Sequence, residues 1–203
     1  MKIKFSQGEL KGQRDALRQY ERYLPTLQLK KQQLQLEIVH QQKTHSERAR
    51  SFSEKKRSAE NWAGLLVETP EIRQWLMPEK IIIQTKNIAG VEIPVFERLD
   101  FEPAQYDLFL TPPWLDAGIE ALRDMVSLLE EIRVLEKGIS VLKHELRITT
   151  QRVNLFEKVK IPEAKEAIRL IKIYIGDQMT NAVGRSKIAK NKIEEANFEE
   201  MAI

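Results

Sequence analysis

The sequence predicts an all-α fold: a long antiparallel two-helix coiled coil, with a small insert that carries a short β-hairpin. Apolar residues recur with heptad spacing toward both ends of the chain, whereas prolines and β-branched runs gather between these two regions. Charged residues make up 31% of the 203 residues, and glycine and proline number only eight each. This composition is typical of extended helices rather than of β-sandwiches or barrels.

The first helix is predicted over about residues 4–68, and the N-terminal coiled-coil segment is residues 1–68. Pro25 stands inside the pattern and is expected to bend the helix without splitting it, because Leu24 and Leu27 stay on the same stripe. The heptad stripe of this segment comprises Ile3, Leu10, Leu17, Tyr20, Leu24, Leu27, Leu34 and Ile38.

Residues 69–113 form the predicted insert, since six of the eight prolines lie there and a long helix cannot continue through them. Two β-branched runs flank a short Asn- and Gly-containing stretch, which predicts a β-hairpin near residues 81–96. Pro94 suits an edge strand, and so small a sheet needs support from neighbouring helices.

The second helix is predicted over residues 114–203, with Thr111 as its N-terminal cap and prolines in its first turn. Its stripe changes phase by one residue next to Pro162, so we expect a kink or a wider helical turn just before this proline. The stripe comprises Met125, Leu128, Ile132, Leu135, Ile139, Leu142, Leu146, Thr149, Val153 and Phe156 before the shift, and Ile161, Ala164, Ile168, Ile171 and Ile175 after it.

Residues for catalysis or metal binding are not grouped in this sequence. Cysteine is absent, the three histidines are not spaced as ligands, and the glycines at 8 and 12 lack the Lys and Ser/Thr of a phosphate-binding loop. We therefore expect no enzyme activity, no cofactor and no metal. No apolar run approaches the roughly 20 residues of a membrane-spanning helix, and the lack of cysteine favours a cytoplasmic location without direct membrane insertion.

Two surface features have alternative interpretations. A basic run on the first helix is interpreted as a solvated helix face rather than a phosphate-binding surface, since no aromatic residues are interleaved with it; it comprises Lys43, Arg48, Arg50, Lys55, Lys56 and Arg57. The three tryptophans, Trp62, Trp75 and Trp114, are interpreted as packing for the insert, with a partner-docking cluster as the alternative.

The second helix carries an Arg-Val-Asn block followed by a Glu and an Ile-Pro pair, and the first carries a Leu- and Lys-rich run at residues 24–31. The chain thereby resembles the D subunit, the central rotor shaft of V-type and archaeal A-type rotary ATPases, and in particular its divergent bacterial branch. The resemblance implies that these residues contact the catalytic head or line the shaft: Arg152, Asn154, Glu157, Ile161, Pro162, Lys30 and Lys31.

In that family the paired helix ends enter a hexameric catalytic head of A and B subunits, and a small F subunit binds the side of the shaft. The C subunit, called d in eukaryotes, couples the foot to the membrane rotor. The resemblance places the insert residues Ile82, Val91 and Phe96 toward that foot. It implies a non-catalytic component that transmits torque between ATP hydrolysis or synthesis and the movement of protons or sodium ions, and that associates peripherally with the membrane through the complex.

A coiled-coil scaffold that bridges other proteins without rotating is the second hypothesis, and a nucleic-acid-binding coiled coil is the third. Co-purification distinguishes them, since only a rotor shaft brings down a hexameric ATPase head. On the rotor hypothesis no nucleic-acid partner is expected.

Overall fold

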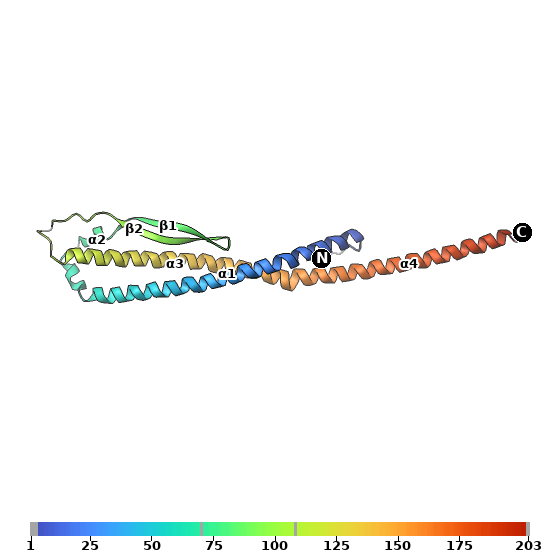
Figure 1. Cartoon of the computed structure of the whole chain (residues 1–203), viewed down its shortest axis with the longest axis horizontal. Coiled ribbons are helices and arrows are strands. Elements are labelled where there is room, and N and C mark those ends of the chain that lie inside the picture. The colour runs from blue at the N-terminus through green and yellow to red at the C-terminus, as the bar shows by residue number, and fades with distance from the viewer. Residues whose placement is uncertain (1–3, 70, 108, 202–203) are drawn as a thin grey trace. The chain divides into compact units, whose positions relative to one another are not determined.

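The computed structural model describes residues 4–69, 71–107 and 109–201, with side chains as far as Glu195. In the sequence, two long helical segments precede and follow a small antiparallel hairpin, and in the fold the hairpin lies alongside α3, so the predicted fold class is confirmed (Figure 1). The elements in order are α1 (Gln7–Glu60), η1 (Ala63–Val67), α2 (Ile72–Trp75), β1 (Pro78–Ile88), β2 (Val91–Phe101), α3 (Leu115–Leu155), η2 (Phe156–Lys160) and α4 (Ile161–Met201).

The chain divides into two units. The terminal unit combines the chain up to Gln28 with the chain from Gln151 on, and the insert unit is Leu29–Thr150. Each unit contains one part of α1 together with one part of the second helical segment.

In the terminal unit the two helical segments run antiparallel. The ring of Tyr20 lies 5.4 Å from that of Phe156, and the ring of Phe5, earlier in the chain, lies 5.0 Å from that of Tyr174, later in the chain. The α4 side of this seam buries small and branched residues, namely Ala164, Ala167 and Ile171. Small residues allow two helices to approach closely, and Ile171 is fully buried between them.

In the insert unit α1 and α3 are also antiparallel, because Lys30 pairs with Glu145 while Lys55 pairs with Asp124. One apolar cluster joins α1, α3 and the hairpin and consists of Leu34, Ile38, Val91, Ile93 and Leu142. The hairpin is therefore supported by both helices, as the sequence predicts for so small a sheet.

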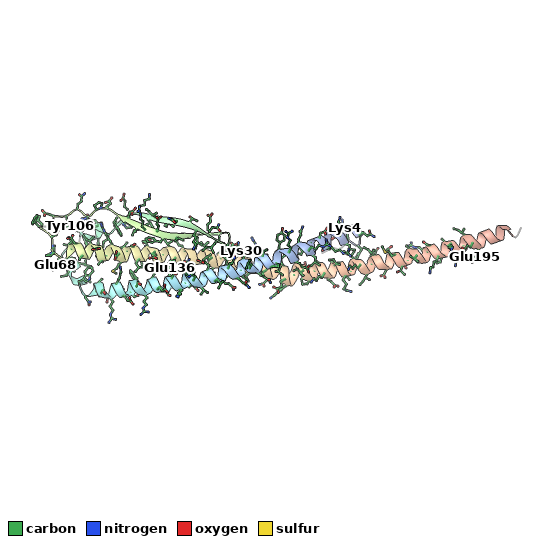
Figure 2. All side chains as sticks on the ribbon, in the orientation of Figure 1. Lys4, Lys30, Glu68, Tyr106, Glu136 and Glu195 are labelled. Atoms are coloured by element: carbon green, nitrogen blue, oxygen red, sulfur yellow. The ribbon has the colours of Figure 1, made fainter. Side chains whose placement is uncertain are left out.

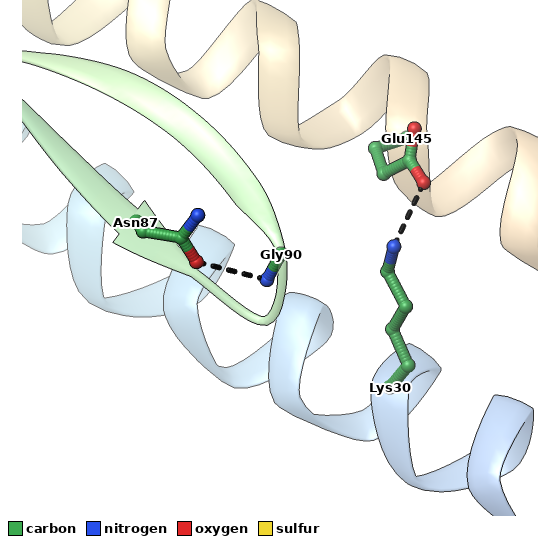
Figure 3. A network of polar contacts seen from close by, with 4 residues as sticks. All are labelled: Lys30, Asn87, Gly90 and Glu145. Atoms are coloured by element: carbon green, nitrogen blue, oxygen red, sulfur yellow. Dashed lines mark hydrogen bonds and ion pairs between the residues drawn. The ribbon is translucent and has the colours of Figure 1, made fainter.

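The hairpin turn consists of Ala89 and Gly90, which both have positive φ angles, of 52° and 77°. Two such residues between antiparallel strands give a turn whose twist matches that of the strands. The Gly90 N–H donates to the Asn87 side-chain oxygen at 3.0 Å, which holds the turn closed (Figure 3). Ala89 is strained in this conformation, and its methyl group packs on the apolar cluster of the insert unit.

The base of the insert forms a second apolar cluster of Ile72, Leu115 and Ile119, against which Trp75, Tyr106 and Trp114 pack. Arg123 of α3 holds this region in place. Its guanidinium donates to the backbone carbonyls of Trp75 and Glu102, and it lies 5.0 Å from the centre of the Phe101 ring. The packing interpretation of Trp75 and Trp114 agrees with these contacts.

Three boundaries differ from the sequence predictions. The first helix ends at Glu60 rather than near Glu68, and the apolar residues beyond it form the 3₁₀ turn η1. Thr111 does not cap the second helix, because its hydroxyl donates to the Asp107 carbonyl and α3 begins only at Leu115. The strands extend on both sides of the predicted hairpin region, residues 81–96.

Two predictions about proline are confirmed. The helix α1 continues through Pro25 from Gln7 to Glu60. The segment η2, just before Pro162, is a π-helical turn, which is the wider turn that the phase shift predicts.

Candidate partner-binding surfaces

The wide turn η2 leaves the Glu157 carbonyl of the terminal unit without a helical donor. The Ile161 N–H donates to the carbonyl of Phe156, five residues back, instead of to that of Glu157. Pro162 has no N–H and so cannot serve the Glu157 carbonyl at the five-residue spacing either. The Glu157 side chain is exposed, as are the apolar side chains of Leu155 and Val159.

The terminal unit contains most of the residues that the resemblance singles out. Arg152, Asn154, Glu157 and Pro162 are exposed, and Ile161 is half-buried. They occupy the end of α3, the wide turn and the start of α4, so the structure brings these five together on one stretch of helix. Lys30 and Lys31 belong to the insert unit and are half-buried there.

A groove of about 500 Å³ lies beside the wide turn in the terminal unit. Its walls are formed by Glu9, Gln13, Ala16 and Tyr20 of α1, by Lys160 of η2, and by Pro162, Glu163, Ala164, Glu166 and Ala167 of α4.

The C-terminal part of α4 has no covering helix among the residues that the structure describes. Every described side chain of residues 176–195 is exposed (Figure 2). Four of them are large and apolar, namely Met179, Val183, Ile188 and Ile193, and each is 57–62% exposed. A run of exposed apolar side chains on a single helix is a strong indication of a partner surface.

Sequence reasoning did not single out these four residues. Their spacing of four and five residues breaks the heptad pattern, so they were not part of the predicted stripe. The sequence offered one signal for a partner surface, namely that these apolar residues lie beyond Ile175, the last residue of the predicted stripe.

In the insert unit, ion pairs between the helices all have one polarity, with the cation on α1 and the anion on α3. Lys30 donates to Glu145 at 3.0 Å, and both side chains are about three-quarters buried (Figure 3). The other ion pairs are Arg48–Glu131 and Lys55–Asp124, and a ring nitrogen of His45 lies 3.2 Å from the Glu136 carboxylate. This shared polarity favours one alignment of the two helices over its alternatives.

The basic run on α1 is largely occupied by ion pairs within the chain. Lys43 and Arg50 pair with glutamates four residues further along α1, while Arg48 and Lys55 pair with α3. These contacts agree with the interpretation of the run as a charged, solvated helix face.

The three insert residues named from the resemblance have different environments. Val91 is buried in the apolar cluster with Leu34 and Leu142, so its side chain is not available to a partner. Ile82 and Phe96 are half-buried on the hairpin. More exposed apolar side chains of the same unit are Val67, Met77, Phe109 and Leu110, with exposed fractions from 71% to 97%.

Within the described ranges, no cluster of three acidic or histidine side chains is arranged to hold a metal ion. Among the same residues, no helix is sufficiently long and apolar to cross a bilayer. Two local contacts shift ionisation. The hydrogen bond that Tyr106 donates to Asp116 raises the pKa of the phenol, and hydrogen bonds from Arg169 lower the pKa of Glu166.

Two antiparallel helical pairs, a hairpin insert and a bare helical end define an extended helical class of protein with apolar surface exposed on a single helix. The family model for the D subunit of ATP synthase matches residues 9–191, and the chain belongs to this family. It is 44% identical to the D subunit of the V-type ATP synthase of Borreliella burgdorferi over 196 residues, which cover 97% of each chain. It is 32% identical to the corresponding D subunit of Chlamydia pneumoniae over 197 residues, which cover 96% of this chain and 94% of that one.

Proposed function

We propose that this chain is the central-stalk rotor shaft of a V-type ATPase, transmitting torque between the catalytic head and the membrane rotor. The family and its V-type relatives support membership of a multisubunit rotary complex. The observation that carries the proposal is the bare part of α4, where four large apolar side chains are exposed over residues 176–195. A helix with this surface requires a partner that surrounds or covers it.

On this proposal the bare part of α4 enters the pore of the head hexamer formed by the A and B subunits. The F subunit binds the side of the shaft, and the C (or d) subunit couples the insert to the membrane ring. The shaft itself is non-catalytic, since ATP chemistry belongs to the head and proton or sodium movement to the membrane rotor. The chain is then peripheral to the membrane and is held there by the complex.

Paired helices suit this task physically. Two helices packed along an apolar seam resist bending and twisting better than one helix, because motion requires the seam side chains to separate. The three ion pairs of one polarity in the insert unit also oppose sliding of α1 along α3, since a slip by one turn would move each cation away from its carboxylate.

Co-purification tests the proposal at the bare part of α4. The tagged chain should recover the A and B subunits from cells that express the whole complex. Changing Met179, Val183, Ile188 and Ile193 together to serine should abolish recovery of A and B while recovery of the F subunit remains, because the other surfaces are unchanged.

The matched control replaces Lys187 and Lys192, two exposed lysines of the same stretch, with serine. This control should still recover the head. Equal recovery of A and B by the apolar variant and the control would contradict a head-binding role for this part of α4.

A further inference from the structure

The hairpin of the insert unit has one covered edge and one open edge. It is a two-stranded sheet, so each strand has an outer edge that no other strand of the described chain occupies (Figure 1). The outer edge of β2 lies against α3, because a Cβ added at Gly138 of α3 would lie 3.6 Å from the Pro94 carbonyl oxygen. In β1, by contrast, every residue except the half-buried Ile82 and Ile88 is exposed. The outer edge of β1 is therefore open to solvent.

The register of the hairpin shows which backbone groups of β1 face this open edge. Ile88 and Val91 flank the two-residue turn, and the flanking pair of such a turn exchanges backbone hydrogen bonds. Bonded and non-bonded pairs alternate along antiparallel strands, so the N–H and C=O groups of Asn87, Thr85 and Ile83 point away from β2. These three residues supply the donors and acceptors to which a further strand would bond.

The open edge of β1 is also regular. From Lys80 to Ile88 each residue of β1 has its own partner on β2, and the additional residue at the register shift within this run is Glu97 of β2. Proteins block exposed edges with proline, with bulges or with charged side chains. The run contains no proline, and its charged residues, Lys80 and Lys86, stand toward its ends. Its centre, residues 81–85, is left without such protection.

The face of the hairpin that points away from the helices is apolar beside this centre. Paired residues share a face, and Ile93 is buried against the helices, so its partner Lys86 marks the inner face of β1. Alternation then places Ile81 and Ile83 on the outer face, where their side chains are 39% and 45% exposed. Phe96 is paired with Ile83 and shares that face. A solvated sheet face is normally polar, so these apolar side chains indicate a surface that a partner covers.

The charges of the hairpin indicate what kind of segment fits the open edge. The ion pair found among the described hairpin residues joins Arg98 and Asp100, which both belong to β2. Lys80 and Lys86 of β1 are exposed and have no ion-pair partner in the described part of the chain, and Glu79 alone offsets them on this strand. A second copy of the chain would bring the same two lysines to the shared edge, where like charges are destabilising. Carboxylates at both ends of a different segment would be attracted instead.

We propose that the open edge of β1 pairs with an extended segment of another protein, apolar in its middle and acidic at both ends. The hairpin then becomes a three-stranded sheet. The outward-facing backbone groups of Ile83, Thr85 and Asn87 bond to the added strand, and its apolar side chains pack beside Ile81. The inference concerns the hairpin alone and does not depend on the rotor role, so failure of one leaves the other standing.

The test uses the full chain and a synthetic peptide of alternating valine and threonine with an aspartate at each end. In the chain alone, the three outward-facing amides of β1 should exchange hydrogen about ten-fold faster or more than those of Gln84 and Lys86, which bond to β2. Added peptide should slow exchange at the three outward-facing amides about ten-fold and leave the amides of α4 unchanged. Unchanged exchange at these three amides would overturn the proposal.

A proline substitution tests the backbone pairing. Thr85→Pro removes one outward-facing N–H, and Pro94, its partner across the hairpin, already occupies a position of the same kind. The variant should bind the peptide about ten-fold more weakly or worse, while continued protection of the Gln84 and Lys86 amides reports an intact hairpin. The control Thr85→Val keeps the N–H and should bind as the wild type does. Equal binding by the proline and valine variants would overturn the pairing at this edge.

A charge reversal tests the acidic ends and leaves every backbone group in place. Lys80→Glu combined with Lys86→Glu should weaken binding of the aspartate-ended peptide about ten-fold and favour a lysine-ended peptide instead. An unchanged preference would overturn the choice of an acidic segment. Sedimentation at increasing chain concentration tests the remaining occupant. If dimerisation of the chain itself protected the three outward-facing amides, the occupant would be a second copy and the proposal would be wrong.

Discussion

Leu142→Ala should weaken the packing of the hairpin against both helices of the insert unit. Leu142 is fully buried among Leu34, Ile38, Val91 and Ile93, so it contacts α1 and β2 at once. The change removes three carbon atoms, or about 2.4 kcal/mol of transfer free energy at about 0.8 kcal/mol per carbon. The cavity that remains adds to this loss, so we expect about 3–4 kcal/mol, within the range seen for buried leucines.

The assay is urea unfolding followed by circular dichroism, together with hydrogen exchange of the β2 amides, which should lose protection in the variant. The matched control is Val141→Ala on the adjacent position of α3, where the side chain is 40% exposed and should matter by less than about 1 kcal/mol. A Leu142→Ala variant that unfolds within about 0.5 kcal/mol of the control would refute the assignment of this residue to a shared core.

Three further predictions concern the insert. Gly138→Ala should raise the free energy of unfolding by up to about 1 kcal/mol, because alanine favours the helix and its Cβ would fit at 3.6 Å from the Pro94 carbonyl oxygen. The larger side chain of Gly138→Leu should displace β2 and lower the melting temperature. Arg123→Met should lower the free energy of unfolding of the insert unit by about 2 kcal/mol, because the hydrogen bonds to the carbonyls of Trp75 and Glu102 are lost. Hydrogen exchange should become faster in β2 but not in α4. The hydrogen bond to Asp116 raises the pKa of the Tyr106 phenol, so the phenol stays neutral and keeps this bond at pH values near 10, where ordinary tyrosines ionise. The contribution of the bond to folding stability is lost as the pH rises through the raised pKa. Asp116→Asn should lower this pKa in an ultraviolet titration, and an unchanged curve would contradict the contact.

The heptad pattern predicted the two helices, and its one-residue phase change predicted the wide turn. Both follow from the same physics, since a buried stripe fixes which face of a helix is inside. Pro25 was correctly predicted to leave α1 continuous, because the stripe keeps its phase on both sides.

Helix ends and partner surfaces were less predictable. Thr111 followed by two prolines has the residue types of a helix start, but its hydroxyl bonds back to the Asp107 carbonyl, a contact that depends on how the loop folds. The apolar residues near Leu66 continue the periodicity of α1, yet they pack on the second cluster of the insert from a 3₁₀ turn. Val91 was expected near a partner surface and lies in the core, because burial depends on packing between segments distant in sequence.

Rotation of the chain within an immobilised head tests the rotor proposal most directly. The chain has no native cysteine, so Lys56→Cys at an exposed position of α1 gives a single attachment point for a bead. With the A and B subunits fixed to a surface, added ATP should make the bead turn continuously in one direction, and removal of ATP should stop it. A bead that only fluctuates about one angle while the same complexes hydrolyse ATP would contradict the rotor and favour a static scaffold.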